Sequence, residues 1–265
     1  MIKIFFEGSI FLHQKRGGIS KYIQKINENL FKYNIRSIIF SPITINKNLK
    51  INKKNEFFYL KLKKIPKFFT KFFYFFNNLL TIFYIKIFKP DILHFSYYNN
   101  ALKNFIKIPY VLTIYDLIHE KLKLDTQKFE KFDLIKRAKH IICISNHTKR
   151  ELIRFYNVKK EKISVIYLGI DQNNFIKKNT KKKNFILFVG PRNRYKNFIN
   201  FIKAYSKSKY LLDTYKVVCF GNEKFSTSEI EMFNKLGIIK NIIFKSGNDS
   251  ELYRNYSYAS LFVTT

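Results

Sequence analysis

Short apolar runs alternate with segments of helical periodicity along the chain, and this alternation constrains the fold more than any other feature. Six runs rich in Ile, Val, Phe and Tyr have the composition of buried strands. They lie at residues 2–6, 37–40, 92–95, 110–114, 141–144 and 163–166. Apolar side chains at helical spacing separate most of them, at residues 19–31, 68–88, 129–137 and 147–155. Strands that alternate with helices form βαβ units around a parallel sheet, so we expect a doubly wound α/β fold.

A polar segment divides the chain into two predicted domains. Residues 172–183 are mostly Asn, Lys and Thr, which is the composition of a linker. We therefore predict a Rossmann-like domain over residues 1–171 and part of a second over 184–265. Further strands are expected at 185–189, 216–220, 242–244 and 261–263, with helices at 197–206, 227–236 and 250–258. Because the sequence stops after the fourth of these strands, we expect the second domain to be incomplete.

The charge balance and the cysteine content limit which partners and which cellular compartment we expect for this protein. The 265 residues include 50 Lys and Arg against 18 Asp and Glu, a formal charge of +32. Such a balance favours nucleic acid or anionic membranes as partners. The basic residues are spread along the chain, however, and A/T-rich codons explain much of the bias, so we predict no nucleic-acid partner. Cys143 and Cys219 lie in predicted strands, as core residues of a protein from a reducing compartment do.

The segment 57–88 leaves two interpretations open. Its longest uncharged stretch, 72–85, is shorter than the roughly 20 apolar residues of a membrane-spanning helix. Its aromatic residues are interleaved with lysines, namely Lys61, Lys63, Lys64, Lys67 and Lys71. This composition fits a helix in the surface of an anionic bilayer, and equally a buried helix whose lysines face solvent. With Glu7 where a signal peptide would still be apolar, we expect a cytoplasmic protein, free or peripheral on the inner membrane face.

Two segments of the first domain carry polar groups at the expected carboxyl ends of strands, where open α/β sheets bind ligands. Gly17-Gly18 precedes a helix, and glycines there allow a ligand to approach backbone N–H groups. A plain turn is the alternative. Asp116, with His119 and Glu120, follows the strand at 110–114 and offers a carboxylate and an imidazole. Here the alternative is a turn capped by Asp116, with the histidine at the surface.

A third segment follows the strand at 185–189 in the second domain. It contains Gly190, Arg192, Arg194 and Lys196. Guanidinium forks and an ammonium group suit the oxygens of a diphosphate, whereas the alternative is a solvated basic loop. The histidines show no metal-ligand spacing with the cysteines, so no zinc site is predicted. The region of Ser145 lacks the flanking glycines of a nucleophile elbow.

Five stretches in order resemble retaining glycosyltransferase family 4, whose members have the GT-B fold. They are residues 17–22, 111–117, 138–145, 161–171 and 188–197. The resemblance implies transfer of a sugar, with retention, from a nucleotide diphosphate sugar to a glycan or lipid-linked acceptor. It further implies a place in the synthesis of surface polysaccharide or lipopolysaccharide, without a metal or another cofactor. In this fold two Rossmann-type lobes face each other across the donor diphosphate.

The resemblance also implies roles for individual residues. The catalytic residues would be Tyr115 and Asp116. Cations aimed at the departing diphosphate stabilise the negative charge that grows on it in the transition state. Lys196 would have this role with Arg192 or Arg194, of which Arg192 is preferred, while Gly17 and Gly18 would bring backbone amides to the diphosphate. The residues implied for the donor nucleotide are Gly190, Gly221, Asp249 and Leu252.

The chain departs from the family pattern at two points. Tyr115 stands where the family has histidine, although a phenol can still hydrogen-bond a sugar hydroxyl. The paired-glutamate motif is expected just after residues 261–263, and the sequence ends at Thr265. We therefore expect a fragment, a degenerate copy or half of a split enzyme completed by a second chain, with weak or absent turnover. The alternative functions are a non-catalytic sugar- or partner-binding module and, on charge alone, a nucleic-acid-binding protein.

Overall fold

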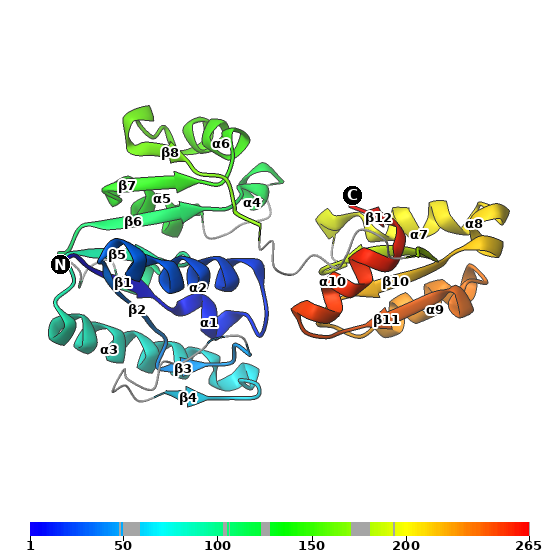
Figure 1. Cartoon of the computed structure of the whole chain (residues 1–265), viewed down its shortest axis with the longest axis horizontal. Coiled ribbons are helices and arrows are strands. Elements are labelled where there is room, and N and C mark those ends of the chain that lie inside the picture. Colours follow the sequence, from blue (N-terminus) through cyan, green and yellow to red (C-terminus); the bar gives the residue numbers. More distant parts are fainter. Residues whose placement is uncertain are drawn as a thin grey trace. The chain divides into compact units, whose positions relative to one another are not determined.

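The chain forms two compact units, Met1–Gly169 and Ile170–Thr265 (Figure 1). The computed structural model describes residues 1–47, 49, 59–102, 105, 107–122, 128–170, 181–192 and 194–264, without the side chains of 67, 128–130 and 194. The division between the units lies beside the predicted end of the first domain at residue 171. Most of the predicted linker, 172–183, lies outside the described residues.

A six-stranded parallel sheet forms the centre of the first unit, in the order β2-β1-β5-β6-β7-β8. The strands are β1 (Lys3–Glu7), β2 (Arg36–Phe40), β5 (Ile92–Phe95), β6 (Tyr110–Ile114), β7 (His140–Cys143) and β8 (Ile163–Val165). The chain winds outward from β1 to β2 and then returns to place β5 on the other side of β1. The strand order therefore reverses between β1 and β5, which is the position where such sheets bind ligands.

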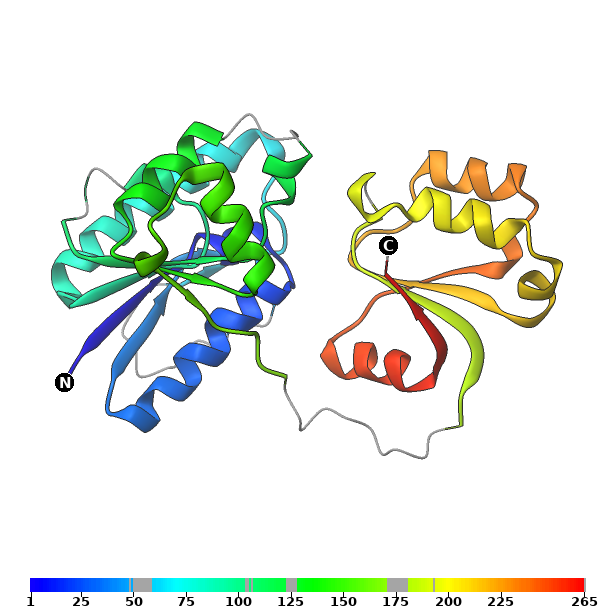
Figure 2. The same ribbon diagram turned by 90° about the horizontal axis from the view of Figure 1, so that it is seen from above.

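Helices cover both faces of this sheet (Figure 2). Successive strand residues point to opposite faces, so Phe6 packs with α1 (Ser9–His13) and α2 (Gly18–Leu30), whereas Phe5 packs on the other face. The helices of that other face are α3 (Thr70–Phe88), α5 (Lys128–Arg137) and α6 (Asn146–Tyr156). None of the helices in the described part of the chain has both the length and the apolar content needed to cross a bilayer.

The second unit repeats this architecture on a smaller scale, with a parallel sheet in the order β11-β10-β9-β12. Its strands are β9 (Lys183–Val189), β10 (Lys216–Phe220), β11 (Ile242–Lys245) and β12 (Ala259–Val263). One face is covered by α7 (Phe198–Ser206), α8 (Lys209–Thr214) and α9 (Thr227–Lys235), and the other by α10 (Asp249–Tyr258). Cys143 and Cys219 are both buried and free, as predicted for core residues.

The two parallel sheets confirm the predicted α/β fold class. Several short elements were not predicted, and all of them depend on contacts that periodicity does not show. They are α1, β3 (Ile43–Thr44), β4 (Leu60–Lys61), α4 (Ile118–Lys121) and α8. Strands β3 and β4 have two residues each and exist because they pair with each other. Helix α1 has five residues, too few for a periodic pattern, and is held by burial of four of them.

Candidate functional site

The predicted Gly17-Gly18 turn and Tyr115 come together at the carboxyl edge of the first sheet. Tyr115 directly follows β6, and its ring packs edge-to-face on that of Tyr22, with 5.8 Å between centroids. Tyr22 belongs to α2 and lies one helical turn after Gly18, so both occupy the same face of that helix. Two segments that are far apart in the sequence therefore form one part of the surface.

The start of α2 is open to a ligand. Gly17 is the N-cap residue in an extended conformation, and no side chain caps the helix. A Cβ atom added to Gly18 would meet no other atom within 4 Å, whereas one on Gly17 would collide with the Gln14 side chain. Packing within the fold therefore does not require a glycine at position 18, and the space beside its backbone is open. The first N–H groups of a helix attract anions when they are uncapped.

Tyr115 has the features of a neutral hydrogen-bonding group. Its hydroxyl oxygen is buried and has no hydrogen-bond partner among the described residues. Burial, assisted by the neighbouring Tyr22, raises the pKa of Tyr115 well above its ordinary value. A buried hydroxyl without a partner is costly and uncommon, so a ligand that supplied the missing hydrogen bond would be stabilised here. The raised pKa favours the neutral phenol, which can donate or accept a hydrogen bond.

Asp116, His119 and Glu120 do not form an acid–base group. The Asp116 carboxylate accepts a hydrogen bond from the backbone N–H of Ile118 at 3.3 Å, as the capped-turn interpretation expects, and His119 is exposed. Glu120 is buried and pairs with Lys131, with 3.1 Å between Oε1 and Nζ. Glu120 is thus a structural residue, while a catalytic role of Asp116 stays a prediction.

Glu7 is a buried carboxylate at the same sheet edge that the motif analysis missed. It ends β1 at the point where the strand order reverses. Its oxygens accept hydrogen bonds from the backbone N–H and hydroxyl of Ser9, each at 2.9 Å, from Asn99 at 2.9 Å and from Ser96 at 3.5 Å. Burial raises the pKa of Glu7, and these hydrogen bonds only partly oppose it. Glu7 could have been identified from the sequence, because it is an acidic residue directly at the end of an apolar run predicted to be a strand.

Two glycines lie side by side at the carboxyl edge of the second sheet. Gly190 donates its N–H to the Phe220 carbonyl at 2.9 Å, and Gly221 donates to the Lys245 carbonyl at 3.0 Å. Gly190 has a φ of +109°, which side chains rarely tolerate. A Cβ on Gly221 would lie 3.2 Å from the Gly190 carbonyl oxygen. Glycine at both positions lets the two turns approach closely and leaves their backbone uncovered.

Arg192, the preferred arginine of the predicted diphosphate site, is engaged by other groups of its own unit, and its role as a diphosphate ligand stays a prediction. Its guanidinium binds the Glu229 carboxylate through two hydrogen bonds, at 2.6 and 3.1 Å, and donates to the carbonyls of Glu223 and Lys224 at 3.1 and 2.9 Å. The guanidinium also lies 4.9 Å from the ring centroid of Phe225. With four hydrogen bonds made inside the unit and only 7% of the side chain exposed, Arg192 holds α9 to the loop after β9.

Lys196, which was predicted to bind the donor diphosphate, lies just before the start of a helix. It ends a 3-10 turn (Arg194–Lys196) directly before Asn197, the N-cap of α7. The lysine is half-buried, with its Nζ atom 5.7 Å from the ring centroid of Tyr195. Helix α7 has no side-chain cap. Its uncapped N–H groups and the ammonium therefore favour an anion at the carboxyl edge of β9. The side chain of Arg194 lies outside the described residues.

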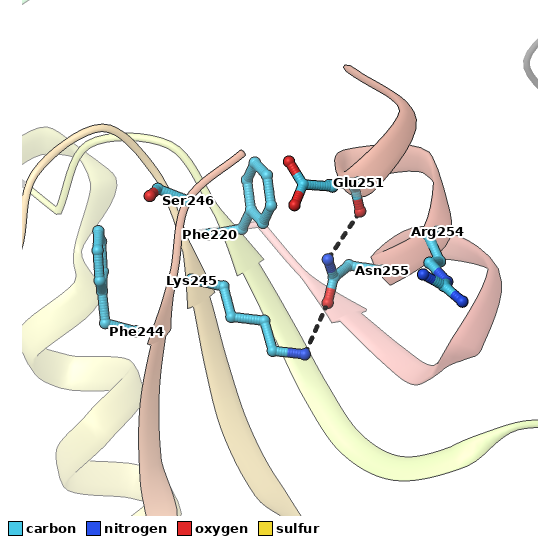
Figure 3. A pocket seen from close by; sticks show the side chains of 7 residues that line it. All are labelled: Phe220, Phe244, Lys245, Ser246, Glu251, Arg254 and Asn255. Carbon is cyan, nitrogen blue, oxygen red and sulfur yellow. Dashed lines mark hydrogen bonds between the residues drawn. The ribbon is translucent and has the colours of Figure 1, made fainter. Parts of the chain in front are cut away.

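A pocket of about 450 Å³ opens beside these turns (Figure 3). Its lining comes from the ends of β10 and β11 and from α10, and consists of Phe220, Phe244, Lys245, Ser246, Glu251, Arg254 and Asn255. Asn255 accepts a hydrogen bond from Lys245 at 3.4 Å and donates one to the Glu251 carbonyl at 2.7 Å. Two aromatic rings with a few polar groups are typical of small-ligand sites.

Asp249 and Leu252, the two other residues implied for binding the donor nucleotide, belong to α10, which forms one side of this pocket. Asp249 is the first residue of α10, and Leu252 follows within its first turn. The Leu252 side chain packs against the core under the sheet, so it supports the pocket and does not line it. None of the residues that line the pocket was among those implied for the donor nucleotide, and a nucleotide role of Asp249 and Leu252 stays a prediction.

Across the described residues, no three His, Cys, Asp or Glu side chains are grouped so that they could hold a metal ion. Two of the histidines have other roles. His94 contacts the Thr113 hydroxyl at 2.9 Å, and His140 contacts the Ser164 hydroxyl at 2.8 Å. Burial lowers the pKa of His94 to about 4, so this imidazole is neutral at physiological pH. The absence of a metal from the reaction stays a prediction.

Two parallel-sheet units, each with glycine turns at its carboxyl edge, define the GT-B class of fold. The family model of Glycosyltransferase Family 4 matches residues 16–174, and that of Glycosyl transferases group 1 matches residues 170–265. The chain therefore belongs to glycosyltransferase family 4, which confirms the family predicted from the five motif stretches.

One curated relative and several solved structures are similar to this chain. The O-antigen chain mannosyltransferase RfbU of Salmonella typhimurium is 31% identical over 136 residues. That match covers 48% of this chain and 36% of the relative, so the chain spans about a third of the length of RfbU.

The solved structures show the fold. WaaG, described as a glycosyltransferase involved in lipopolysaccharide biosynthesis, has a TM-score of 0.70 at 15% identity, over 99% of this chain and 75% of WaaG. HepE from Anabaena, in complex with UDP and glucose, has a TM-score of 0.67 at 12% identity, over 100% of this chain and 74% of HepE. A glycosyltransferase from Rickettsia africae has a TM-score of 0.63 at 17% identity, over 99% and 72% of the two chains.

Proposed function

We propose that this chain acts in the transfer of a sugar, with retention, from a nucleotide diphosphate sugar to a glycan or lipid-linked acceptor, in lipopolysaccharide or polysaccharide synthesis. The observation that carries the proposal is the pocket at the end of β11, which lies on the same sheet edge as the Gly190 and Gly221 turns. The mannosyltransferase relative and the UDP-bound neighbour support the same chemistry.

The second unit would bind the nucleoside diphosphate. A base fits the aromatic and polar pocket formed by Phe220, Phe244 and the polar groups of α10. The diphosphate would then meet the bare backbone of Gly190 and Gly221, which leave no side chain in its way. Lys196 and the start of α7 supply positive charge for the oxygen that departs from the sugar. Such charge lowers the barrier because it stabilises the transition state more than the bound substrate.

The first unit would contribute hydrogen bonds to the sugar. The unpartnered hydroxyl of Tyr115 suits a sugar hydroxyl, and Gly17 and Gly18 offer backbone amides at the open start of α2. Asp116 is exposed one residue beyond Tyr115 and is the carboxylate implied as catalytic by the family resemblance. A second chain that supplies further residues stays a prediction, which co-purification tests. Two buried free cysteines support a location in the reducing cytoplasm.

Replacing Lys196 with alanine is expected to weaken binding of nucleoside diphosphates by about 10- to 100-fold, because a charge-assisted hydrogen bond contributes about 1.5–3 kcal/mol. Isothermal titration calorimetry with UDP, GDP and ADP measures this effect without requiring turnover. Lys203→Ala is the matched control, since Lys203 is an exposed lysine in the last turn of the same helix. Equal affinity of K196A and wild type, or no binding of any of the three diphosphates, would contradict the proposal.

Chelation of divalent metals is expected to leave this binding unchanged. The described residues offer no cluster of metal ligands, and Lys196 with the α7 start already supplies positive charge for the diphosphate. The same titration in EDTA and in Mg²⁺ tests the point. A gain of about tenfold in affinity with Mg²⁺, which is about 1.4 kcal/mol, would show that a metal takes part.

A further inference from the structure

Helix α3 buries two polar side chains in its middle turns and exposes a row of large apolar side chains. It buries Asn77 and Thr81 in its middle turns, together with Ile85 and Phe88 near its end. The opposite side exposes large apolar residues, namely Phe72, Phe75, Phe76, Leu79, Phe83 and Ile87. In an ordinary surface helix the apolar stripe faces the core and the polar face meets water. Helix α3 buries apolar residues near its end, but it differs from this pattern because its other side is apolar and exposed.

The buried side of α3 is held by specific contacts, so the helix is not free to turn its apolar side inward. The Asn77 side-chain oxygen accepts the Ile43 N–H at 3.4 Å, and the Asn78 oxygen accepts from Asn99 at 2.8 Å. The ring of Tyr84 stacks on that of Phe40, with 4.5 Å between centroids and 11° between planes. These contacts join α3 to the end of β2, to β3 and to the loop after β5, and Figure 1 shows α3 beside β2 and β3.

The exposed residues form one continuous stripe. Positions 72, 76, 79, 83 and 87 are three or four apart and therefore lie along one face of the helix. The 3-10 turn before α3 (Lys67–Phe69) extends the stripe with Phe68, which is 89% exposed, and Phe69. Phe75 and Phe83 are 63% and 62% exposed. We call these eight residues, 68, 69, 72, 75, 76, 79, 83 and 87, the α3 stripe. Contiguous exposed apolar surface of this kind marks an interaction site.

The charges around the α3 stripe are of one sign. Residues 57–90 contain no Asp or Glu. Exposed lysines lie at both ends of the stripe, namely Lys61, Lys63, Lys64 and Lys71 before or at its start and Lys86 and Lys89 at its end. An apolar strip with ammonium groups at both ends complements a surface that is apolar inside and anionic at its boundary. Two copies of this chain packed stripe to stripe would set lysines against lysines, which is unfavourable.

We propose that α3 lies in the surface of an anionic bilayer, with the phenylalanines of the α3 stripe at the boundary between headgroups and acyl chains. An interfacial helix places its apolar face about 5–10 Å into that boundary, while nearby lysines contact lipid phosphates. The structure thus favours the first of the two interpretations that the composition of residues 57–88 left open. A buried helix would have its phenylalanines inside, whereas Phe72, Phe75, Phe76 and Phe83 of α3 are exposed. The proposal does not depend on the proposed transferase activity.

Vesicle flotation with the full chain tests this membrane contact. Wild type is expected to bind vesicles of phosphatidylcholine with phosphatidylglycerol at least about tenfold better than pure phosphatidylcholine, and less well at high salt. The double substitution Phe75→Ser/Phe83→Ser is expected to reduce binding at least about tenfold. Phe31→Ser, at an aromatic residue that is 70% exposed but lies outside the α3 stripe, is the matched control and is expected to bind as wild type does.

Two further experiments test the role of the lysines and the depth to which the helix inserts. Lys71→Glu/Lys86→Glu is expected to abolish the preference for anionic vesicles, whereas Lys159→Glu/Lys160→Glu, the same charge change at exposed lysines elsewhere, is expected to retain it. The chain contains no tryptophan, so Phe83→Trp introduces a single reporter. Its emission is expected to shift to the blue on vesicle binding and to be quenched by brominated lipid.

Three results would overturn the proposal. The first is wild type that stays in solution with anionic vesicles. The second is binding that survives Phe75→Ser/Phe83→Ser. The third is a concentration-dependent dimer, seen by analytical ultracentrifugation, that the same double substitution dissolves, because the α3 stripe would then be a contact between copies. Circular dichroism and melting temperature of each variant show whether it is folded.

Discussion

Glu120→Ala is expected to lower the free energy of unfolding of the first unit by about 3–5 kcal/mol, because it breaks a buried ion pair by removing one of its two members. The side chains of Lys131 and Glu120 are 7% and 1% exposed, and the pair is 3.1 Å long. Glu120 also accepts a hydrogen bond from the Tyr156 hydroxyl at 2.6 Å, so the substitution removes one buried contact of Lys131 and one of Tyr156. Urea denaturation of wild type and variant, followed by circular dichroism, measures the loss.

A double substitution that removes both charges of the pair is the control for Glu120→Ala. Glu120→Leu/Lys131→Met removes both charges, and it is expected to recover most of the lost stability because well-packed apolar residues often replace a buried ion pair at little cost. Affinity for nucleoside diphosphates is expected to be the same in every variant that folds. If Glu120→Ala changed the unfolding free energy by less than about 0.5 kcal/mol, the typical range for surface substitutions, the structural role assigned to Glu120 would be wrong.

Arg192→Ala is expected to destabilise the second unit by about 3–5 kcal/mol, since the Glu229 carboxylate then loses its buried partner. Arg192→Lys keeps the charge but loses the planar fork that reaches Glu229 and two backbone carbonyls, so it is expected to cost about 2–3 kcal/mol. Thermal unfolding, together with hydrogen exchange in peptides from β9 and α9, measures the effect on this unit.

Ligand binding distinguishes a structural Arg192 from a phosphate ligand. Arg192→Lys is expected to bind nucleoside diphosphates within about twofold of wild type at a temperature where it is folded, in contrast to the loss expected for Lys196→Ala. A loss of affinity in Arg192→Lys with an unchanged melting temperature would instead identify Arg192 as the phosphate ligand that the sequence motif suggested.

Acid is expected to weaken the same ion pair. Burial alone would raise the pKa of Glu229, but hydrogen bonds from Arg192 and Ser226 outweigh it and hold this pKa below its usual value of 4.5. The pair therefore contributes stability above pH 4.5 and loses it as the pH falls through the lower pKa of the folded state. Arg192→Ala is expected to show a smaller loss of stability than wild type over this acid range.

The outline of the fold could be predicted because its signals are local. Strands β5, β6 and β10 were predicted with the bounds observed, and each is an apolar run ended by polar, proline or glycine residues. The motif stretches were also expected at the carboxyl edges of the two sheets, because parallel strands place their carboxyl ends on one side of a sheet. The Gly17-Gly18 turn, Tyr115 and the Gly190 turn all lie at such an edge.

The roles of individual side chains could not be predicted in the same way. Arg192 and Glu229 are 37 positions apart, and nothing near Arg192 in the sequence shows that its guanidinium is used for structure. Glu120 and Lys131 likewise meet only after α5 packs on the sheet. In a chain with 50 basic residues, a cationic motif does not show which cation is left for a ligand.

Helix α3 marks the boundary between local pattern and three-dimensional packing most clearly. Its sequence predicted a long helix rich in phenylalanine and lysine, because the local pattern of residues is enough to predict a helix. Which side faces water was decided by partners distant in the chain, among them Phe40 and Asn99, which hold Tyr84 and Asn78 against the first unit. Helix formation depends on neighbours three and four residues away, whereas orientation depends on contacts that exist only once the sheet has assembled.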